Sequence, residues 1–275
     1  MDASDRMPDV QSRPATTHNI QVLDHTGRLS EVPVVGEYPL TITLNGTEVV
    51  TLMTLAAHPE DLVLGYLRNQ RLISRYADIL SVKEDWEHDT VHVKAKNHNL
   101  ADMKQQMKRK VVTTGCGEGT VFSCSLDKIY DRPLSPFRIR QSDIYGLGKE
   151  LLTRSDIYKA AGSVHTCALC TPEKVIYHVE DVGRHNAADT ISGKMWAADM
   201  DGGDTLLYST GRVTSEIVIK CASMGIPIIL SRSGITRMGY DIARDLNMVV
   251  IGRAKARKFM VYCGHSQVIL DAVSS

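Results

Sequence analysis

The sequence predicts an α/β protein in which a smaller α+β lobe precedes a larger domain with a largely parallel or mixed sheet flanked by helices. Residues 205–251 alternate between short apolar runs and longer stretches with helical spacing, which is typical of a layered α/β sheet. Residues 18–55 instead hold closely spaced apolar runs. A Gly-rich stretch at 113–120 separates the two regions.

The N-terminal region combines predicted strands with one helix. Strands are expected in the alternating runs of residues 18–55, and Asn45-Gly46 is a strong signal for a hairpin turn between two of them. Pro59 opens a helix that runs from Glu60 to about Ser74, and residues 85–96 read as a further strand. Residues 1–17 lack the apolar stretch of a secretory signal, so we expect a flexible tail.

Composition limits the function classes. The chain has 275 residues, 43% of them hydrophobic, and its formal net charge is zero, so no overall field favours nucleic acid or a membrane. No apolar run reaches the roughly 18 residues of a membrane span. Six cysteines without a secretion signal favour reduced thiols and a cytoplasmic protein, in which metal or sulfur chemistry is possible.

The middle of the chain breaks the pattern of regular elements. A helix-like run at 101–110 ends in a basic cluster, which is either a solvated face or an entry path for an acidic partner. Pro133 and Pro136 close the Gly-rich stretch. We therefore divide the chain into a tail (1–17), an N-terminal lobe (18–112), a cysteine loop with linker (113–140) and a C-terminal domain (141–275).

The C-terminal domain has the clearer element pattern. Ser142 is expected to cap a helix that runs to about Lys159. Strands are then predicted at 205–209, 226–230 and 248–251, with helices at 213–224 and 236–246 between them. Right-handed crossovers follow from that order of elements.

Arginine accompanies glycine or serine directly after every one of these strands. Arg212 and Arg232 follow the first two strands, the basic segment 252–258 follows the third, and Arg184 follows an earlier apolar run, 175–177. Backbone N–H groups and guanidinium groups bind phosphate oxygens well, so the strand ends predict a phosphate-bearing ligand. Neither a dinucleotide-binding glycine fingerprint nor a P-loop occurs in the sequence.

The polar run 177–189 follows the apolar run 175–177 at the start of a predicted helix. Asn186 is expected to cap that helix, and Gly193 to end it. Open α/β sheets bind ligands at such strand ends. The alternative is an ordinary strand-to-helix turn with solvated charges.

The cysteines differ in their surroundings. Cys116 lies between two glycines with basic residues shortly before it, which predicts an exposed thiol with a lowered pKa that reacts as thiolate. Cys167 and Cys170 form a C-x-x-C that suits half a zinc site, a redox pair or a resolving pair for a persulfide. Cys221 lies among apolar helix residues and is expected in the core.

Four segments, one of them the predicted helix region Pro59–Leu67, carry a family resemblance that extends over roughly residues 20–265. Glu180–Asp189 (EDVGRHNAAD) resembles the signature of the FdhD family, the formate dehydrogenase accessory sulfurtransferases. Thr114–Gly117 resembles the family's TGCG loop, and Ser209–Val218 resembles its S-[ST]-[GR]-R-x-[ST]-x-E-[MI]-V segment.

The resemblance implies a function. Members accept sulfur from a cysteine desulfurase as a cysteine persulfide and pass it to the molybdenum bis-guanine-dinucleotide cofactor of formate dehydrogenase. That cofactor is a client, and no permanent cofactor or metal is predicted. The resemblance also implies a cytidine-deaminase-like C-terminal domain, a homodimer, and contact with the desulfurase and the formate dehydrogenase catalytic subunit.

The resemblance also assigns residues. The carrier cysteine maps to Cys116. The cofactor-binding segment maps to Arg253, Ala254, Lys255, Ala256, Arg257 and Lys258, with Arg212 and Arg184 as further phosphate contacts.

One departure from the family concerns the cysteine loop. Gly119 stands where many members have a second loop cysteine, so one hypothesis gives Cys167 or Cys170 the resolving role. Two other function classes stay open. One is a chaperone that holds the cofactor without sulfur transfer, and the other is a zinc hydrolase of the deaminase type that uses Cys167, Cys170 and His178.

Overall fold

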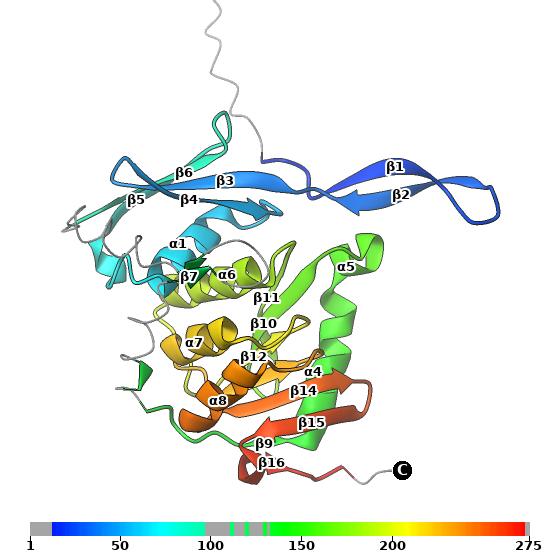
Figure 1. Ribbon diagram of the computed structural model, residues 1–275, viewed down its shortest axis with the longest axis vertical. Helices are drawn as coiled ribbons and strands as arrows, with labels where there is room; N and C mark the ends of the chain where they lie inside the picture. The colour runs from blue at the N-terminus through cyan, green and yellow to red at the C-terminus, as the bar shows by residue number, and fades with distance from the viewer. Residues whose placement is uncertain (1–12, 97–110, 113–118, 121–128, 131–132, 273–275) are drawn as a thin grey trace, which may run out of the picture.

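The computed structural model describes residues 13–96, 111–112, 119–120, 129–130 and 133–272. Figure 1 shows two layered regions, one built on a four-stranded sheet and one on a six-stranded sheet. The mixed α/β class predicted from the sequence is confirmed. Among the described residues, no helix is both long and apolar enough to cross a bilayer.

The N-terminal strands form a hairpin arm and a sheet. The arm pairs β1 (Thr17–Leu23) with β2 (Leu29–Val35) and extends sideways beyond the sheet (Figure 1). The sheet has the order β4-β3-β6-β5, from β3 (Tyr38–Leu44), β4 (Thr47–Thr54), β5 (Ile79–Asp85) and β6 (Thr90–Ala95). The predicted Asn45-Gly46 hairpin is confirmed, and both residues have the positive φ of a tight turn. Helix α1 (Pro59–Asn69) packs its apolar face on this sheet.

The six-stranded sheet is mixed. Its order is β11-β10-β12-β13-β14-β15. The strands are β10 (His165–Cys170), β11 (Val175–Asp181), β12 (Leu206–Ser209), β13 (Ile228–Ser231), β14 (Val249–Lys255) and β15 (Lys258–Cys263). Only the β12–β13 and β13–β14 pairings are parallel among these described strands. The predicted end of the third strand at Ile251 is wrong, because β14 continues and returns as β15 in a hairpin.

Helices cover both faces of this sheet (Figure 1). Helix α4 (Gln141–Arg154) covers one face, and α6 (Arg184–Ala197), α7 (Ser215–Ser223) and α8 (Arg237–Asp245) cover the other. The shorter described elements are α5 (Asp156–Ala161), η1 (Tyr76–Asp78), η2 (His265–Gln267), β7 (Val111–Val112), β8 (Gly119–Thr120), β9 (Ile139–Arg140) and β16 (Val268–Ile269).

The predicted helix 142–159 is two helices. Ser142 does not cap α4, because the helix begins at Gln141 and the Ser142 hydroxyl donates to Asp271 at 2.7 Å. The chain leaves the helical conformation at Ser155, whose hydroxyl donates back to the Leu151 carbonyl. Side-chain bonds of this kind compete with the helix ladder, so α5 starts as a separate helix.

The two regions meet where α1 crosses α6. A Cβ at Gly65 would lie 1.7 Å from the Asp189 carbonyl oxygen, and a Cβ at Gly193 would lie 1.9 Å from that of Asp61. Only glycine permits so close an approach of two helix backbones. The prediction that Gly193 ends its helix is therefore wrong: α6 continues to Ala197, and this glycine serves the crossing.

Candidate ligand-binding site at the carboxyl ends of the strands

The strand ends that carry arginine lie at one edge of the six-stranded sheet. Strand β10 is antiparallel to both β11 and β12, so β11 ends at the same edge as the parallel strands β12, β13 and β14. The loops after them are joined by backbone bonds, for example from Arg232 N–H to the Ser209 carbonyl (3.0 Å) and from Arg253 N–H to the Ser233 carbonyl (2.8 Å). The four strand ends with arginine therefore lie together at this edge.

The acidic residues of the run 180–189 are buried, so the alternative of solvated charges is wrong. Asp181 accepts hydrogen bonds from the Thr54 hydroxyl (2.6 Å), from the Leu55 and Gly183 N–H groups, and from the Asn186 amide. Burial raises the pKa of Asp181, while these four bonds act to lower it. Two of the four donors come from the end of β4, so this carboxylate joins the two regions of the fold.

Asn186 has a long-range role rather than a capping role. Helix α6 begins at Arg184 with Gly183 in the cap position, and the Asn186 amide donates to the Met53 carbonyl at 2.8 Å as well as to Asp181. Further along, Asp189 accepts from Asn69 and from Lys220, each at 2.7 Å. These polar residues position α6 against the N-terminal region.

Arg184 and His185, the basic residues of the same run, lie near His165, Arg212 and Lys220. Burial and the nearby charges of Arg184 and Arg212 lower the pKa of His165. The pKa of His185 falls to about 2, first because of burial and then because Lys220 and Arg184 lie close to it. Helix α6 packs on the Cys167 face of the sheet, opposite α4.

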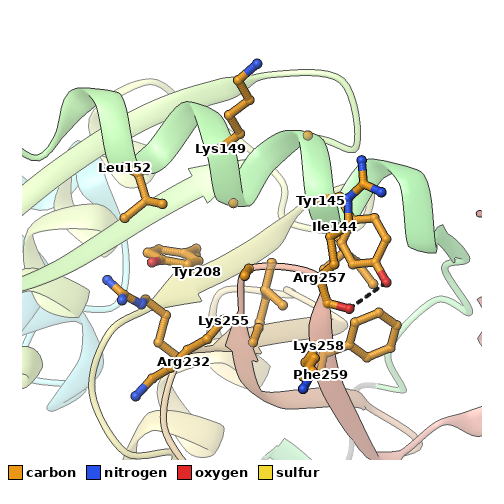
Figure 2. Close-up of a pocket in the computed structure, with 15 residues that line it drawn as sticks. Ile144, Tyr145, Lys149, Leu152, Tyr208, Arg232, Lys255, Arg257, Lys258 and Phe259 are labelled. Atoms are coloured by element: carbon orange, nitrogen blue, oxygen red, sulfur yellow. Dashed lines mark hydrogen bonds between the residues drawn. The ribbon is translucent and has the colours of Figure 1, made fainter. Parts of the chain in front are cut away.

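The other face carries a cavity of about 420 Å³ between α4 and the β14–β15 hairpin (Figure 2). The described residues that line it are Ile144, Tyr145, Gly146, Gly148, Lys149, Leu152, Tyr208, Leu230, Arg232, Ala254, Lys255, Ala256, Arg257, Lys258 and Phe259. Its volume suits a small ligand, and its apolar wall with a few convergent charged groups is typical of a small-molecule site.

Two contacts set the form of the cavity. The Tyr145 hydroxyl donates to the Arg257 carbonyl at 2.9 Å and so ties the hairpin turn to α4 (Figure 2). Burial raises the pKa of Tyr208 to about 12, and the charge of the nearby Arg232 guanidinium opposes that rise. The amino group of Lys149 points away from the cavity (Figure 2).

The structure brings together five of the residues predicted to bind the cofactor: Ala254, Lys255, Ala256, Arg257 and Lys258. These five residues lie in the β14–β15 hairpin. The prediction from the sequence, a loop after the third strand, is therefore wrong. Arg253 lies in β14 outside this lining, and Arg184 and Arg212 belong to the group on the α6 face. Cys116, the predicted carrier, and the basic run 101–110 fall outside the described residues.

The C-x-x-C cysteines do not form a pair. Cys167 packs in the core on the α6 face and Cys170 in the core on the α4 face. Burial raises the pKa of each thiol to about 12. Within the described part of the chain, no three His, Cys, Asp or Glu side chains form a group that could hold a metal. A zinc hydrolase site from these thiols and His178 is therefore wrong, and so is a redox pair.

The aromatic residues of the lining, Tyr145, Tyr208 and Phe259, were not predicted as ligand-binding. The Tyr145 and Phe259 rings lie with centroids 6.1 Å apart, on α4 and β15. Their sequence signal was weak, since a single aromatic in a helix or strand usually belongs to the core. Arg232 was recognised only as one of several arginines at strand ends.

Comparison with known proteins gives a consistent result. The FdhD/NarQ family matches residues 35–269. The sulfur carrier protein FdhD of Geobacillus kaustophilus is 32% identical over 85% of this chain and 89% of its own length. The protein of the same name from Bacillus subtilis is 34% identical over 86% of this chain and 91% of its own. A crystal structure provisionally described as a formate dehydrogenase accessory protein, from Desulfotalea psychrophila, shares the fold with a TM-score of 0.73. It is 23% identical and covers 92% of this chain and 98% of that one.

Proposed function

The chain belongs to the FdhD/NarQ family, and from that premise we propose that it is a sulfur carrier for formate dehydrogenase. It receives persulfide sulfur from a cysteine desulfurase and transfers it to the molybdenum bis-guanine-dinucleotide cofactor. The observation that carries this proposal is the cation-lined cavity under α4, because a guanine-dinucleotide client needs a pocket with both apolar walls and groups for phosphate.

Cys116 is the proposed carrier. The four described cysteines (Cys167, Cys170, Cys221 and Cys263) are all buried, and burial raises the pKa of each thiol, to about 11 for Cys263. A thiol with a raised pKa is a poor nucleophile at neutral pH. A carrier thiol is therefore better sought in Cys116 or Cys124, and only Cys116 lies in the TGCG motif.

The loading step is a thiol–persulfide exchange. The Cys116 thiolate attacks the outer sulfur of the desulfurase persulfide, a new S–S bond forms at Cys116, and the desulfurase leaves as thiolate. The outer sulfur then passes to the client as sulfide and Cys116 leaves as thiolate. The two electrons that this sulfur gains come from the client's metal centre. The attacking atom must be ionised, so the basic residues before Cys116 support the first step.

The cavity under α4 is the proposed nucleotide site. Arg232, Lys255, Arg257 and Lys258 supply the charges for the phosphates. Tyr145 and Phe259 supply aromatic surface for the guanine base. Arg253, Arg184 and Arg212 lie outside this lining, and their contact with the cofactor remains a prediction.

Intact-mass spectrometry tests the carrier assignment. After incubation with a cysteine desulfurase and cysteine, we expect the parent protein to gain the mass of one sulfur atom and the Cys116→Ala variant to gain none. Cys124→Ala serves as the matched control and should still be loaded. Loading of Cys116→Ala would contradict the assignment, whereas no loading of any protein would favour a chaperone that holds the cofactor without sulfur transfer.

A further inference from the structure

Buried polar groups without a hydrogen-bond partner gather where α6 and α7 begin. Arg184 is 6% exposed, yet its Nε and Nη2 atoms have no hydrogen-bond partner among the described residues. The same holds for Nδ1 of His185 and for the hydroxyl of Thr214. Burying a guanidinium group without a partner costs roughly several kcal/mol of folding free energy. We therefore expect an anionic ligand to bind Arg184.

These groups lie close to one another. His185 Nδ1 is 3.5 Å from Glu216 in the first turn of α7, which places the starts of α6 and α7 side by side. The Arg184 side chain packs on Gly211, where an added Cβ would lie 2.8 Å from its Cδ atom. Arg212 follows directly and lies near enough to lower the pKa of both His165 and His185.

The neighbouring carboxylates are already engaged by other groups. Glu216 lies 3.6 Å from the Lys220 amino group, and Asp189 lies 2.7 Å from the same group. Asp181 is surrounded by its four donors. Among the described residues, no carboxylate forms an ion pair with Arg184 or Arg212. This corner of the fold therefore holds two guanidinium charges, those of Arg184 and Arg212, that no described carboxylate pairs with.

Two helix N-termini add to that charge. Neither α6, with 14 residues, nor α7, with 9, has a side chain that caps its first N–H groups. Free N–H groups and the positive end of the helix dipole both favour an anion. We propose that Arg184, Arg212 and the starts of α6 and α7 form a second anion site, for a compact oxyanion of the phosphate or sulfate class.

This site is separate from the cavity under α4. None of its residues lines that cavity, and the two lie on opposite faces of the six-stranded sheet. The oxyanion has two possible sources, a free ion or the diphosphate of a guanine nucleotide. The guanidinium can offer two parallel N–H donors to either one, and the Thr214 hydroxyl can offer a third.

Thermal unfolding of the full chain tests the proposal, with sodium phosphate titrated against sodium chloride at constant ionic strength. We expect a saturable rise in Tm with phosphate in the parent, since a ligand that binds only the folded state stabilises it. Arg184→Met should lose that rise, and Arg212→Ala should weaken phosphate binding about fivefold without touching the core. Arg244→Ala, another exposed arginine, is the matched control and should behave like the parent.

Additional readouts separate the outcomes. In the parent, phosphate should raise the NMR-measured pKa values of His165 and His185. Guanosine diphosphate that competes with phosphate at Arg184 identifies a nucleotide phosphate as the source, whereas additive binding identifies a free ion. An equal Tm rise in the parent, Arg184→Met and Arg212→Ala, or in chloride, overturns the proposal. That failure leaves nucleotide binding under α4 untouched, because other residues form that cavity.

Discussion

The segment 180–189 and the hairpin segment 253–258 both carry charged residues at the same edge of the sheet but differ in exposure. In the first, Glu180, Asp181 and Asp189 are buried and accept specific hydrogen bonds. In the second, Lys255 and its charged neighbours are exposed. A buried charge depends on its partners, whereas an exposed charge remains solvated when a partner is lost.

That difference predicts two kinds of residue in one site region. Changes at Glu180, Asp181 and Asp189 should act through the stability of the fold, because each lost carboxylate leaves buried donors unsatisfied. Changes in the hairpin should act through ligand binding and leave the free energy of unfolding nearly unchanged. Reading motif residues as ligand contacts without regard to burial would confuse the two.

The largest contrast is expected between Asp181→Ala and Lys255→Ala. The first removes the acceptor of four hydrogen bonds and should lower the free energy of unfolding by about 3–5 kcal/mol. The second should change it by less than about 0.5 kcal/mol. Urea unfolding of both variants measures this, and similar losses in the two would break the comparison.

The parallel pairing of β12, β13 and β14 could be predicted from the sequence, because alternating strands and helices imply right-handed crossovers and that rule needs only the order of elements. The true start of α6 was missed because the partner of Asn186 is the Met53 carbonyl, 133 residues away. No local pattern contains such a contact. Gly193 likewise looked like a helix end. A glycine is needed there because the backbone of α1 approaches α6 closely at this position.

Other features were accessible but misread. Residues three apart in a strand face opposite sides, so recognising β10 would have separated Cys167 from Cys170. The hairpin was missed because the basic residues of 253–258 interrupt the apolar pattern that continues in β15. Tertiary pairing with β15 determines the end of β14.

A pH dependence of intermediate size should arise in the buried segment. His185 titrates near 6.5 when unfolded, but its pKa is about 2 in the fold, so between these two pH values only the unfolded state takes up a proton. Its contribution to stability is complete above pH 6.5 and is lost as the pH falls. At pH 5 the loss should be about 2 kcal/mol.

Urea unfolding at pH 7.5 and pH 5 measures this loss, with His185→Asn as the test variant. The variant should lose less stability than the parent over that interval, while His25→Asn, at an exposed residue, should lose as much as the parent. The raised pKa values of Asp181 and Asp189 act with the opposite sign, since they favour the fold at low pH, but they are common to all three proteins. Equal losses in parent and His185→Asn would show that His185 is not the source.

The smallest free-energy change is expected in the exposed cavity and should appear in binding alone. Arg232→Ala and Lys255→Ala should each weaken guanosine diphosphate about tenfold, or 1.4 kcal/mol, because each removes one charge that faces the phosphates. Lys149→Ala is the control, since the amino group of Lys149 points away from the cavity (Figure 2).

Isothermal titration calorimetry at two salt concentrations gives both the affinity for guanosine diphosphate and the electrostatic part of that affinity. Exposed charges are screened by salt, so affinity in the parent should fall as salt rises, and less steeply in the two variants. Weak binding that is insensitive to both substitutions and to salt would place the nucleotide elsewhere and leave the hairpin charges as ordinary surface.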